Sequence, residues 1–108
     1  MKTFVILYGQ NLPGRLNNNY EIYDVTTIIN CDDIEDSMRT YVIDAFKKRG
    51  KSEKNLDENL YCRRRTLYLH DSTILADRIK VFDHEATNEF YAFVPIGVFV
   101  KFDKSTSM

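Results

Sequence analysis

The sequence predicts an α+β domain, a two-layer sandwich in which one amphipathic helix packs on a mainly antiparallel sheet. The 108 residues carry 44% hydrophobic and 29% charged side chains, the balance of a single globular domain. One segment has helical periodicity, whereas the runs on both sides of it are rich in β-branched and aromatic residues. Since a lone amphipathic helix needs an apolar surface to cover, we expect a sheet beneath it and the element order ββαβββ.

Two strands are expected before the helix. Residues 2–8 form a short apolar run that ends at Gly9, which predicts a buried strand. Residues 10–19 contain Pro13-Gly14 and three consecutive asparagines, so they predict a loop. Residues 20–30 predict a second strand, antiparallel to the first because a loop of about ten residues cannot hold a crossover helix.

The helix is expected over residues 33–49. Asp32 and Glu35 have the spacing of a capping box, and Gly50 stands where a left-handed C-terminal cap is expected. Basic residues in the last turn complement the helix dipole. Apolar residues recur along one helical face at Ile34, Met38, Tyr41, Val42, Ala45 and Phe46.

The rest of the chain predicts a β-rich half. Residues 60–70 read as a strand that turns at Asp71-Ser72 into another strand, clearest at 79–82, although residues 72–82 also fit a short helix. Residues 83–88 predict a polar turn. Within the apolar stretch 90–102, Pro95 and Gly97 mark either a bend or a tight hairpin that would add a sixth strand. We expect one domain over residues 1–103 and a disordered tail over 104–108.

Basic residues concentrate in the middle of a chain whose net charge is −1. Eight of the fifteen basic residues, against three acidic ones, lie between Lys47 and Arg65. A two-residue turn at 71–72 would place Arg65 opposite Arg78, and a four-residue turn would place it opposite Lys80. Either register gathers four cations on one sheet face, whereas a three-residue turn or a helix at 73–79 would disperse them. The alternative function is therefore nucleic-acid binding, by Arg63, Arg65, Arg78, Lys80, Lys47, Lys48, Lys51, Lys54 and Tyr61.

Tyrosines and phenylalanines, seven of each, exceed what one small core hides, so several tyrosines are expected at the surface. Those expected at a recognition surface are Tyr20, Tyr23, Tyr61, Tyr68 and Tyr91. The leading hypothesis is a non-enzymatic protein-interaction module, monomeric or homodimeric, that binds a partner protein through a sheet face or an edge strand. Codon-like bias toward Ile, Asn, Lys and Tyr suggests an accessory regulator from a phage or an AT-rich bacterium.

A third hypothesis is a small metal-dependent or acid/base enzyme. His70-Asp71 and Asp83-His84-Glu85 each follow a strand-like run, and they would form such a site only if the two turns met. Ordinary turn chemistry explains them, and no common catalytic template is present, so we predict no metal and no cofactor. With no signal-peptide pattern and no membrane-spanning run, the prediction is a cytoplasmic protein in which Cys31 and Cys62 stay reduced.

Overall fold

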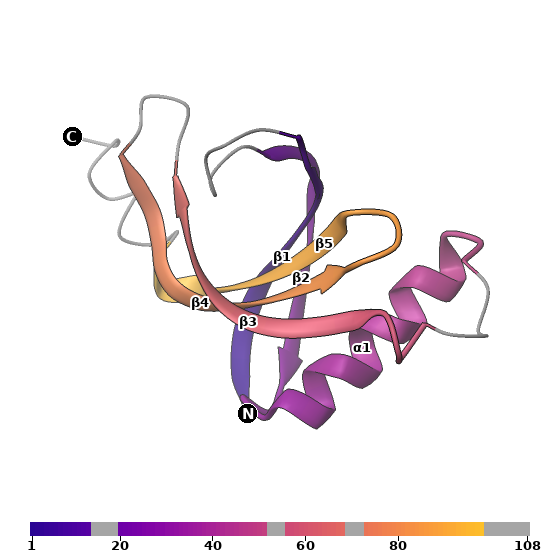
Figure 1. Cartoon of the computed structure of the whole chain (residues 1–108). Helices are drawn as coiled ribbons and strands as arrows, with labels where there is room; N and C mark the ends of the chain where they lie inside the picture. Colours follow the sequence, from indigo (N-terminus) through magenta and orange to yellow (C-terminus); the bar gives the residue numbers. More distant parts are fainter. Residues whose placement is uncertain (14–19, 52–55, 69–72, 99–108) are drawn as a thin grey trace.

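A single curled antiparallel sheet and one helix make up the architecture. The structure, a computed structural model, describes residues 1–13, 20–51, 56–68 and 73–98, with the side chains of all of these except 23–26. The five strands form one sheet in the order β2-β1-β5-β4-β3, and every neighbouring pair is antiparallel (Figure 1). The prediction of a mixed α+β protein with an antiparallel sheet is confirmed. Along the chain the elements are β1 (Lys2–Asn11), β2 (Tyr20–Cys31), α1 (Glu35–Lys48), β3 (Leu60–Tyr68), β4 (Ile74–His84) and β5 (Glu89–Pro95).

The central strands β1 and β5 are buried on both faces. On one face, Phe4 and Ile6 of β1 and Phe93 of β5 pack against the helix. On the other face, Val5, Leu7 and their β5 neighbours belong to a second apolar cluster, against which Ile96 and Val98 of the helical turn after β5 also pack. The sheet itself encloses this second cluster, because β3 and β4 bend strongly and curl (Figure 1). The two-layer sandwich describes only the helical side and stays a prediction.

Helix α1 follows the predicted periodicity. Met38, Val42 and Phe46 are fully buried, and each such side chain contributes about 1.5–3 kcal/mol by leaving water. At the C-terminus Gly50 adopts φ +87°, while the Gly50 and Lys51 amides donate to the Lys47 and Phe46 carbonyls. This is the predicted glycine cap in its Schellman form. No described helix is long and apolar enough to cross a membrane.

The predicted capping box at the start of α1 is wrong. The N-cap is Ile34, which makes no side-chain cap hydrogen bond, and Ile34 is exposed rather than part of the apolar face. Asp33 instead accepts hydrogen bonds from Lys80 Nζ (2.7 Å) and Lys2 Nζ (3.1 Å), and these bonds lower the pKa of its carboxyl. The acidic residues before the helix therefore join β1 and β4 to this turn instead of capping the helix.

Residue 72 lies outside the described residues, and the structure decides the ambiguity over the rest of 72–82 in favour of a strand. β4 runs without helix from Ile74 to His84, so it extends into the segment predicted as a turn, which is confined to 85–88. β5 then begins one residue earlier than expected. Residues 96–98 form a helical turn, so Val98 does not begin the expected hairpin strand; residues 99–102 of that strand and the predicted tail 104–108 lie outside the described residues.

Tyr20 joins the two edge strands of the curled sheet at one end. Its hydroxyl donates to the Tyr68 carbonyl (2.9 Å) and accepts from the Tyr68 amide (2.7 Å). A single side chain on β2 thereby satisfies both backbone groups of one residue on β3, although the two strands are not paired with each other. At this end of the curled sheet, the described contact between β2 and β3 is therefore made by a side chain and not by a ladder of backbone hydrogen bonds.

Gly9 is required by close packing rather than by an unusual φ angle. A Cβ atom at this position would lie 2.2 Å from the Glu21 carbonyl oxygen and 2.9 Å from Phe90 Cζ, whereas one at Gly97 would meet nothing within 4 Å. We expect Gly9→Ala to lower the free energy of unfolding by about 1–3 kcal/mol, as overpacking does. Gly97→Ala should change it by less than about 0.5 kcal/mol. Urea denaturation of the two variants checks this, and equal effects would contradict it.

Candidate functional site

The predicted cluster of four cations on one sheet face is wrong. In the β3–β4 hairpin Arg65 lies opposite Ile79, Arg64 opposite Lys80 and Arg63 opposite Val81. The register shifts between Arg65 and Leu67, where Asp77 and Arg78 of β4 face Thr66 alone and Arg78 adopts φ +53°. Residues directly opposite each other in an antiparallel pair share a face, so Lys80 shares the face of Arg64, and neighbours along a strand alternate between faces. Lys80 therefore lies on the face opposite to Arg63 and Arg65.

Arg63 and Arg65 share a face, as predicted, but both are paired with Asp83, and the Arg63 side chain stays 59% exposed. The Asp83 carboxylate accepts hydrogen bonds from Arg63 Nε (2.8 Å) and Arg65 Nη1 (3.0 Å), and from Asn11 Nδ2 (2.8 Å). The Arg65 side chain is only 8% exposed, and its guanidinium lies 5.3 Å from the ring centre of Phe90. These two arginines hold the sheet together at Asp83, which reduces their availability to phosphates.

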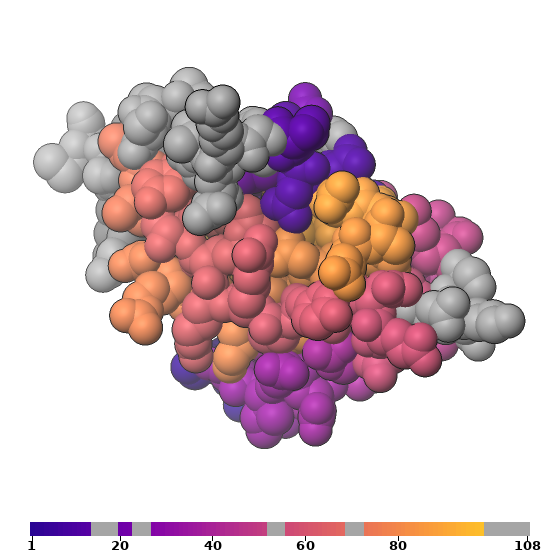
Figure 2. All heavy atoms as spheres, viewed as in Figure 1, coloured from indigo at the N-terminus to yellow at the C-terminus, as the bar shows by residue number. Residues whose placement is uncertain are grey.

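The other predicted phosphate-binding residues are scattered. Lys80 binds Asp33, Lys51 Nζ lies 2.7 Å from Glu89 Oε1, and Lys48 Nζ lies 3.2 Å from Asp44 Oδ2. Lys47 is exposed at the end of α1, Arg78 and Tyr61 are exposed on the hairpin, and Lys54 lies outside the described residues. β3 crosses the front of the molecule in Figure 2. No single basic face is formed by the part of this set that the structure describes.

The candidate acid/base residues are engaged in internal contacts. Asp83 and His84 border the same shallow hollow, but neighbouring residues of a strand point to opposite faces. The His84 ring packs on Phe46 (5.3 Å between ring centres) and its Nδ1 lies 3.2 Å from Thr87 Oγ1. Burial lowers the pKa of His84. His70 and Asp71 lie outside the described residues, within which no group of three metal-ligating side chains occurs.

Both cysteines are free thiols without a nucleophilic environment. Cys31 and Cys62 are half-buried. Burial raises the pKa of both, that of Cys62 to about 11, and the neighbouring Glu35 carboxylate adds to the effect. A thiol that stays protonated at neutral pH is a poor nucleophile.

The five tyrosines expected at the surface differ in how exposed they are. Tyr91 is 3% exposed, so the expectation for it is wrong: it lies on a central strand whose two faces are both covered. Tyr20 and Tyr68 are half-buried and bonded to each other, and Tyr61 is 54% exposed. The Tyr23 side chain is outside the described set. Of the five, Tyr61 alone is a described tyrosine that offers most of its ring to solvent.

The two edge strands differ in how they present their outer sides. β3 carries three consecutive arginines. Both edge pairs have register shifts, near Thr66 in β3–β4 and on both sides of Tyr8 in β1–β2. β2 is twelve residues long, contains no Lys, Arg or Pro, and has no charged residue from Val25 to Cys31. Ile28 of β2 is 62% exposed, on the face away from α1, since its partner Val5 belongs to the second apolar cluster.

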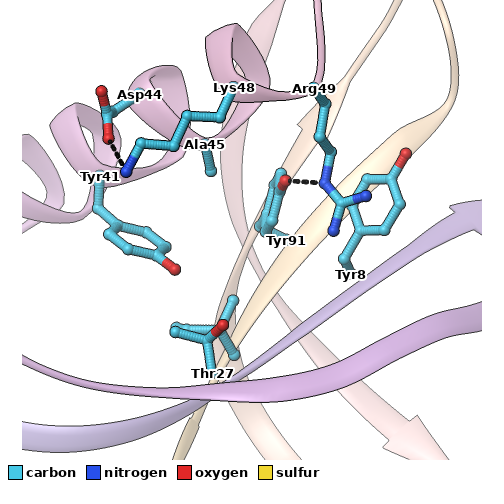
Figure 3. Close-up of a pocket in the computed structure, with 9 residues that line it drawn as sticks. Tyr8, Thr27, Tyr41, Asp44, Ala45, Lys48, Arg49 and Tyr91 are labelled. Carbon is cyan, nitrogen blue, oxygen red and sulfur yellow. Dashed lines mark hydrogen bonds and ion pairs between the residues drawn. The ribbon is translucent and has the colours of Figure 1, made fainter.

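A hollow of about 370 Å³ lies between the C-terminal half of α1 and the sheet (Figure 3). Arg49 reaches down from the end of α1 and lies over the Tyr8 ring, 3.7 Å from its centre, while its Nε donates to Tyr91 Oη (2.7 Å). The Tyr8 hydroxyl in turn donates to Glu89. The lining residues are Ile6, Tyr8, Thr27, Tyr41, Asp44, Ala45, Lys48, Arg49 and Tyr91.

Sequence analysis did not identify this hollow. Two periodic patterns in the sequence indicate where some of its lining residues lie. Tyr8 continues the alternation of Phe4 and Ile6, and Tyr41 belongs to the apolar stripe of α1. Both tyrosines therefore had to lie between the helix and the sheet. No comparable pattern predicts that Arg49 lies over the Tyr8 ring, because this contact depends on where the helix ends above the sheet.

Comparisons with family models, with curated proteins and with solved structures found no match for this chain. Its function is therefore argued from its own surfaces.

Asp83 is expected to be the most sensitive polar position. Asp83→Asn leaves the buried Arg65 guanidinium without its counter-charge, so the free energy of unfolding should fall by about 3 kcal/mol or more. Asp57→Asn, which breaks an exposed pair with Arg39, should cost less than about 1 kcal/mol. Chemical denaturation measures both, and similar losses would show that the Asp83 network contributes little.

His84 predicts a stability that falls with acidification. Burial lowers its pKa below the ordinary 6.5, so the unfolded chain takes up a proton that the folded protein does not. The contribution is fully present above pH 6.5 and is lost as the pH falls toward the lower folded pKa. Urea denaturation at pH 7.5 and 5.5 should show a decrease in the wild type and a smaller one in His84→Gln. An equal decrease in both would refute this assignment.

Proposed function

We propose that this protein is a small protein-interaction module that receives an extended segment of a partner protein along the outer edge of β2. One observation carries the proposal: β2 ends the sheet of described strands and lacks the Lys, Arg or Pro that natural edges carry against pairing with other chains. The opposite edge, β3, carries three arginines. The contrast supports β2 as the edge adapted for pairing.

The side chains of β2 fit this mode of binding. A strand added to a sheet edge gains main-chain hydrogen bonds, and its alternate side chains gain specificity from the surface beside them. Ile28, with 62% of its surface exposed, would be covered by such a segment next to Val5. Thr27, also exposed, borders the hollow on the other face. Each face of the added strand therefore meets a different surface.

The alternatives from the sequence have less support. Nucleic-acid binding relied on Arg63 and Arg65 acting together with Lys80, but the first two bind Asp83 and the third binds Asp33. An acid/base enzyme relied on Asp83 and His84, which are held in internal contacts. A cytoplasmic location and a regulatory role against a host protein are parts of the proposal that stay predictions.

Ile28→Lys should weaken binding at this edge. Peptides selected from a displayed random library against the wild-type protein supply the ligands, and their affinities are measured by fluorescence anisotropy. A charge buried beneath the added strand should weaken binding at least tenfold, about 1.4 kcal/mol. Ile74→Lys is the matched control, because Ile74 is 57% exposed on β4, and it should change affinity less than twofold.

Three outcomes would overturn the proposal. Selected peptides could bind wild type and Ile28→Lys equally, or no peptide dependent on Ile28 could be recovered. Light scattering could also show a wild-type dimer that Ile28→Lys converts to monomer. In that case a second copy of this chain, rather than a partner protein, would occupy β2.

A further inference from the structure

The shallow hollow that Asp83 and His84 border, called the turn hollow below, lies beside the β4–β5 turn. Its volume of about 480 Å³ is within the range of small-molecule sites, about 300–1,000 Å³. None of its described lining residues belongs to β2, so a ligand here does not depend on the proposed pairing edge. The lining residues are Asn11, Tyr61, Cys62, Arg63, Asp83, His84, Glu85 and Asn88.

Tyr61 supplies a flat surface at this hollow. The residue is 54% exposed, and among the described residues its ring stacks on no other aromatic side chain. Exposed aromatic rings stack well on planar heterocycles, and every nucleobase presents such a face. Arg63, two residues further along β3, lies on the same face of the sheet, about 6.6 Å away along the strand. A planar ring stacked on Tyr61 would therefore have one edge near Arg63.

The guanidinium of Arg63 is fixed at one end and open at the other. Its Nε donates to Asp83 Oδ2 (2.8 Å), and Asp83 is itself held by Asn11 Nδ2 (2.8 Å) and Arg65 Nη1 (3.0 Å). The two Nη atoms of Arg63 have no acceptor in the part of the chain that the structure describes, and the side chain is 59% exposed. An arginine held in this way can donate two parallel hydrogen bonds to adjacent acceptors at little cost in conformational entropy.

The β4–β5 turn adds acceptor groups. The Glu85 amide donates to the Asn59 carbonyl (2.8 Å) and the Asn88 amide donates to the His84 carbonyl (2.8 Å), so the backbone of the turn is fixed at both ends. The side chains of Glu85 and Asn88 are exposed and make no hydrogen bond to any described residue. The Glu85 carboxylate can therefore accept two hydrogen bonds from a bound group.

The charges around the turn hollow favour an uncharged ligand with both donors and acceptors. Arg63 and Arg65 share the single carboxylate of Asp83, so this network keeps a charge of +1, whereas Glu85 carries −1. A simple anion would be attracted by Arg63 and repelled by Glu85. A planar ring with acceptors on one edge and donors on the next satisfies both residues.

We propose that the turn hollow binds a guanine base stacked on Tyr61. Of the four RNA bases, guanine alone presents two adjacent acceptors, O6 and N7, next to two adjacent donors, N1–H and N2–H. Arg63 donates to O6 and N7, and Glu85 accepts from N1–H and N2–H. Adenine has an amino group in place of O6, so it would meet Arg63 with a donor. A free guanine nucleotide and a guanine in single-stranded RNA share this chemistry, and the test includes both sources.

Binding is measured by NMR titration of the full chain with the 5′-monophosphates of guanosine, adenosine, cytidine and uridine, which share phosphate and ribose. We expect guanosine monophosphate to shift the resonances of the lining residues and to bind at least about tenfold more tightly than the other three. Inosine monophosphate, which lacks the N2 amino group, should bind about fivefold more weakly than the guanosine compound. Absence of guanosine monophosphate binding, or equal affinity for adenosine monophosphate, would overturn the proposal.

Variants assign the contacts within the hollow. Glu85→Gln should weaken guanosine monophosphate at least about fivefold and reduce its advantage over inosine monophosphate to less than about twofold. Glu58→Gln removes an exposed carboxylate outside the hollow and should change affinity less than about twofold. Tyr61→Ala should weaken binding at least about fivefold, whereas Tyr61→Phe keeps the ring and should bind like the wild type. Melting temperatures confirm that each variant is folded. A folded Glu85→Gln that keeps the wild-type preference for guanosine over inosine monophosphate would refute the assignment.

A short oligonucleotide distinguishes the two sources of the base. The single-stranded RNA UUGUUU, which contains one guanine, is compared with guanosine monophosphate and with UUUUUU. Tighter binding of UUGUUU than of the nucleotide would identify single-stranded RNA as the source, and equal binding would identify the free nucleotide. UUUUUU that binds as tightly as UUGUUU would contradict recognition of guanine.

Discussion

Burial of β1 and β5 on both faces is the constraint on which the rest of the structure depends. Alternate residues of these strands are apolar on the helix side and on the far side, so each side requires its own cover. Helix α1 covers one side. The far side is covered by the sheet itself, which must curl, and by Ile96 and Val98 after β5. The curl brings Tyr20 of β2 to the backbone of Tyr68 on β3. The long β3–β4 hairpin supplies the bend (Figure 1).

The curl also decides how the charged residues are used. On its inner side Arg65 loses most of its contact with water, and Asp83 provides the counter-charge together with Arg63. Of the arginine run, Arg65 is thereby committed to a buried pair with Asp83, whereas Arg63 keeps 59% of its side chain exposed. On the helix side Lys80 reaches Asp33 in the same way. The surfaces left for recognition are those that these networks do not occupy.

Two such surfaces meet at the middle of β2. Thr27 is part of the edge strand and also borders the hollow beneath Arg49 and Tyr41, whereas the adjacent Ile28 projects from the opposite face. A segment paired with β2 would therefore pass the mouth of the hollow.

Local patterns in the sequence determined the element types: the periodicity of Met38, Val42 and Phe46, the glycine cap at Gly50, and the strand runs on either side of the helix. These depend on interactions within a few residues, which sequence spacing reports directly. Only the tertiary structure decided the face on which Lys80 lies, the burial of Tyr91 and the hollow under Arg49. The register of the β3–β4 pair decides which residues share a face with Lys80, and no local pattern within either strand marks that register. Likewise, the residues that bury Tyr91 and the tyrosine side chains that Arg49 contacts belong to segments far away in the chain. These contacts therefore form only when the sheet folds.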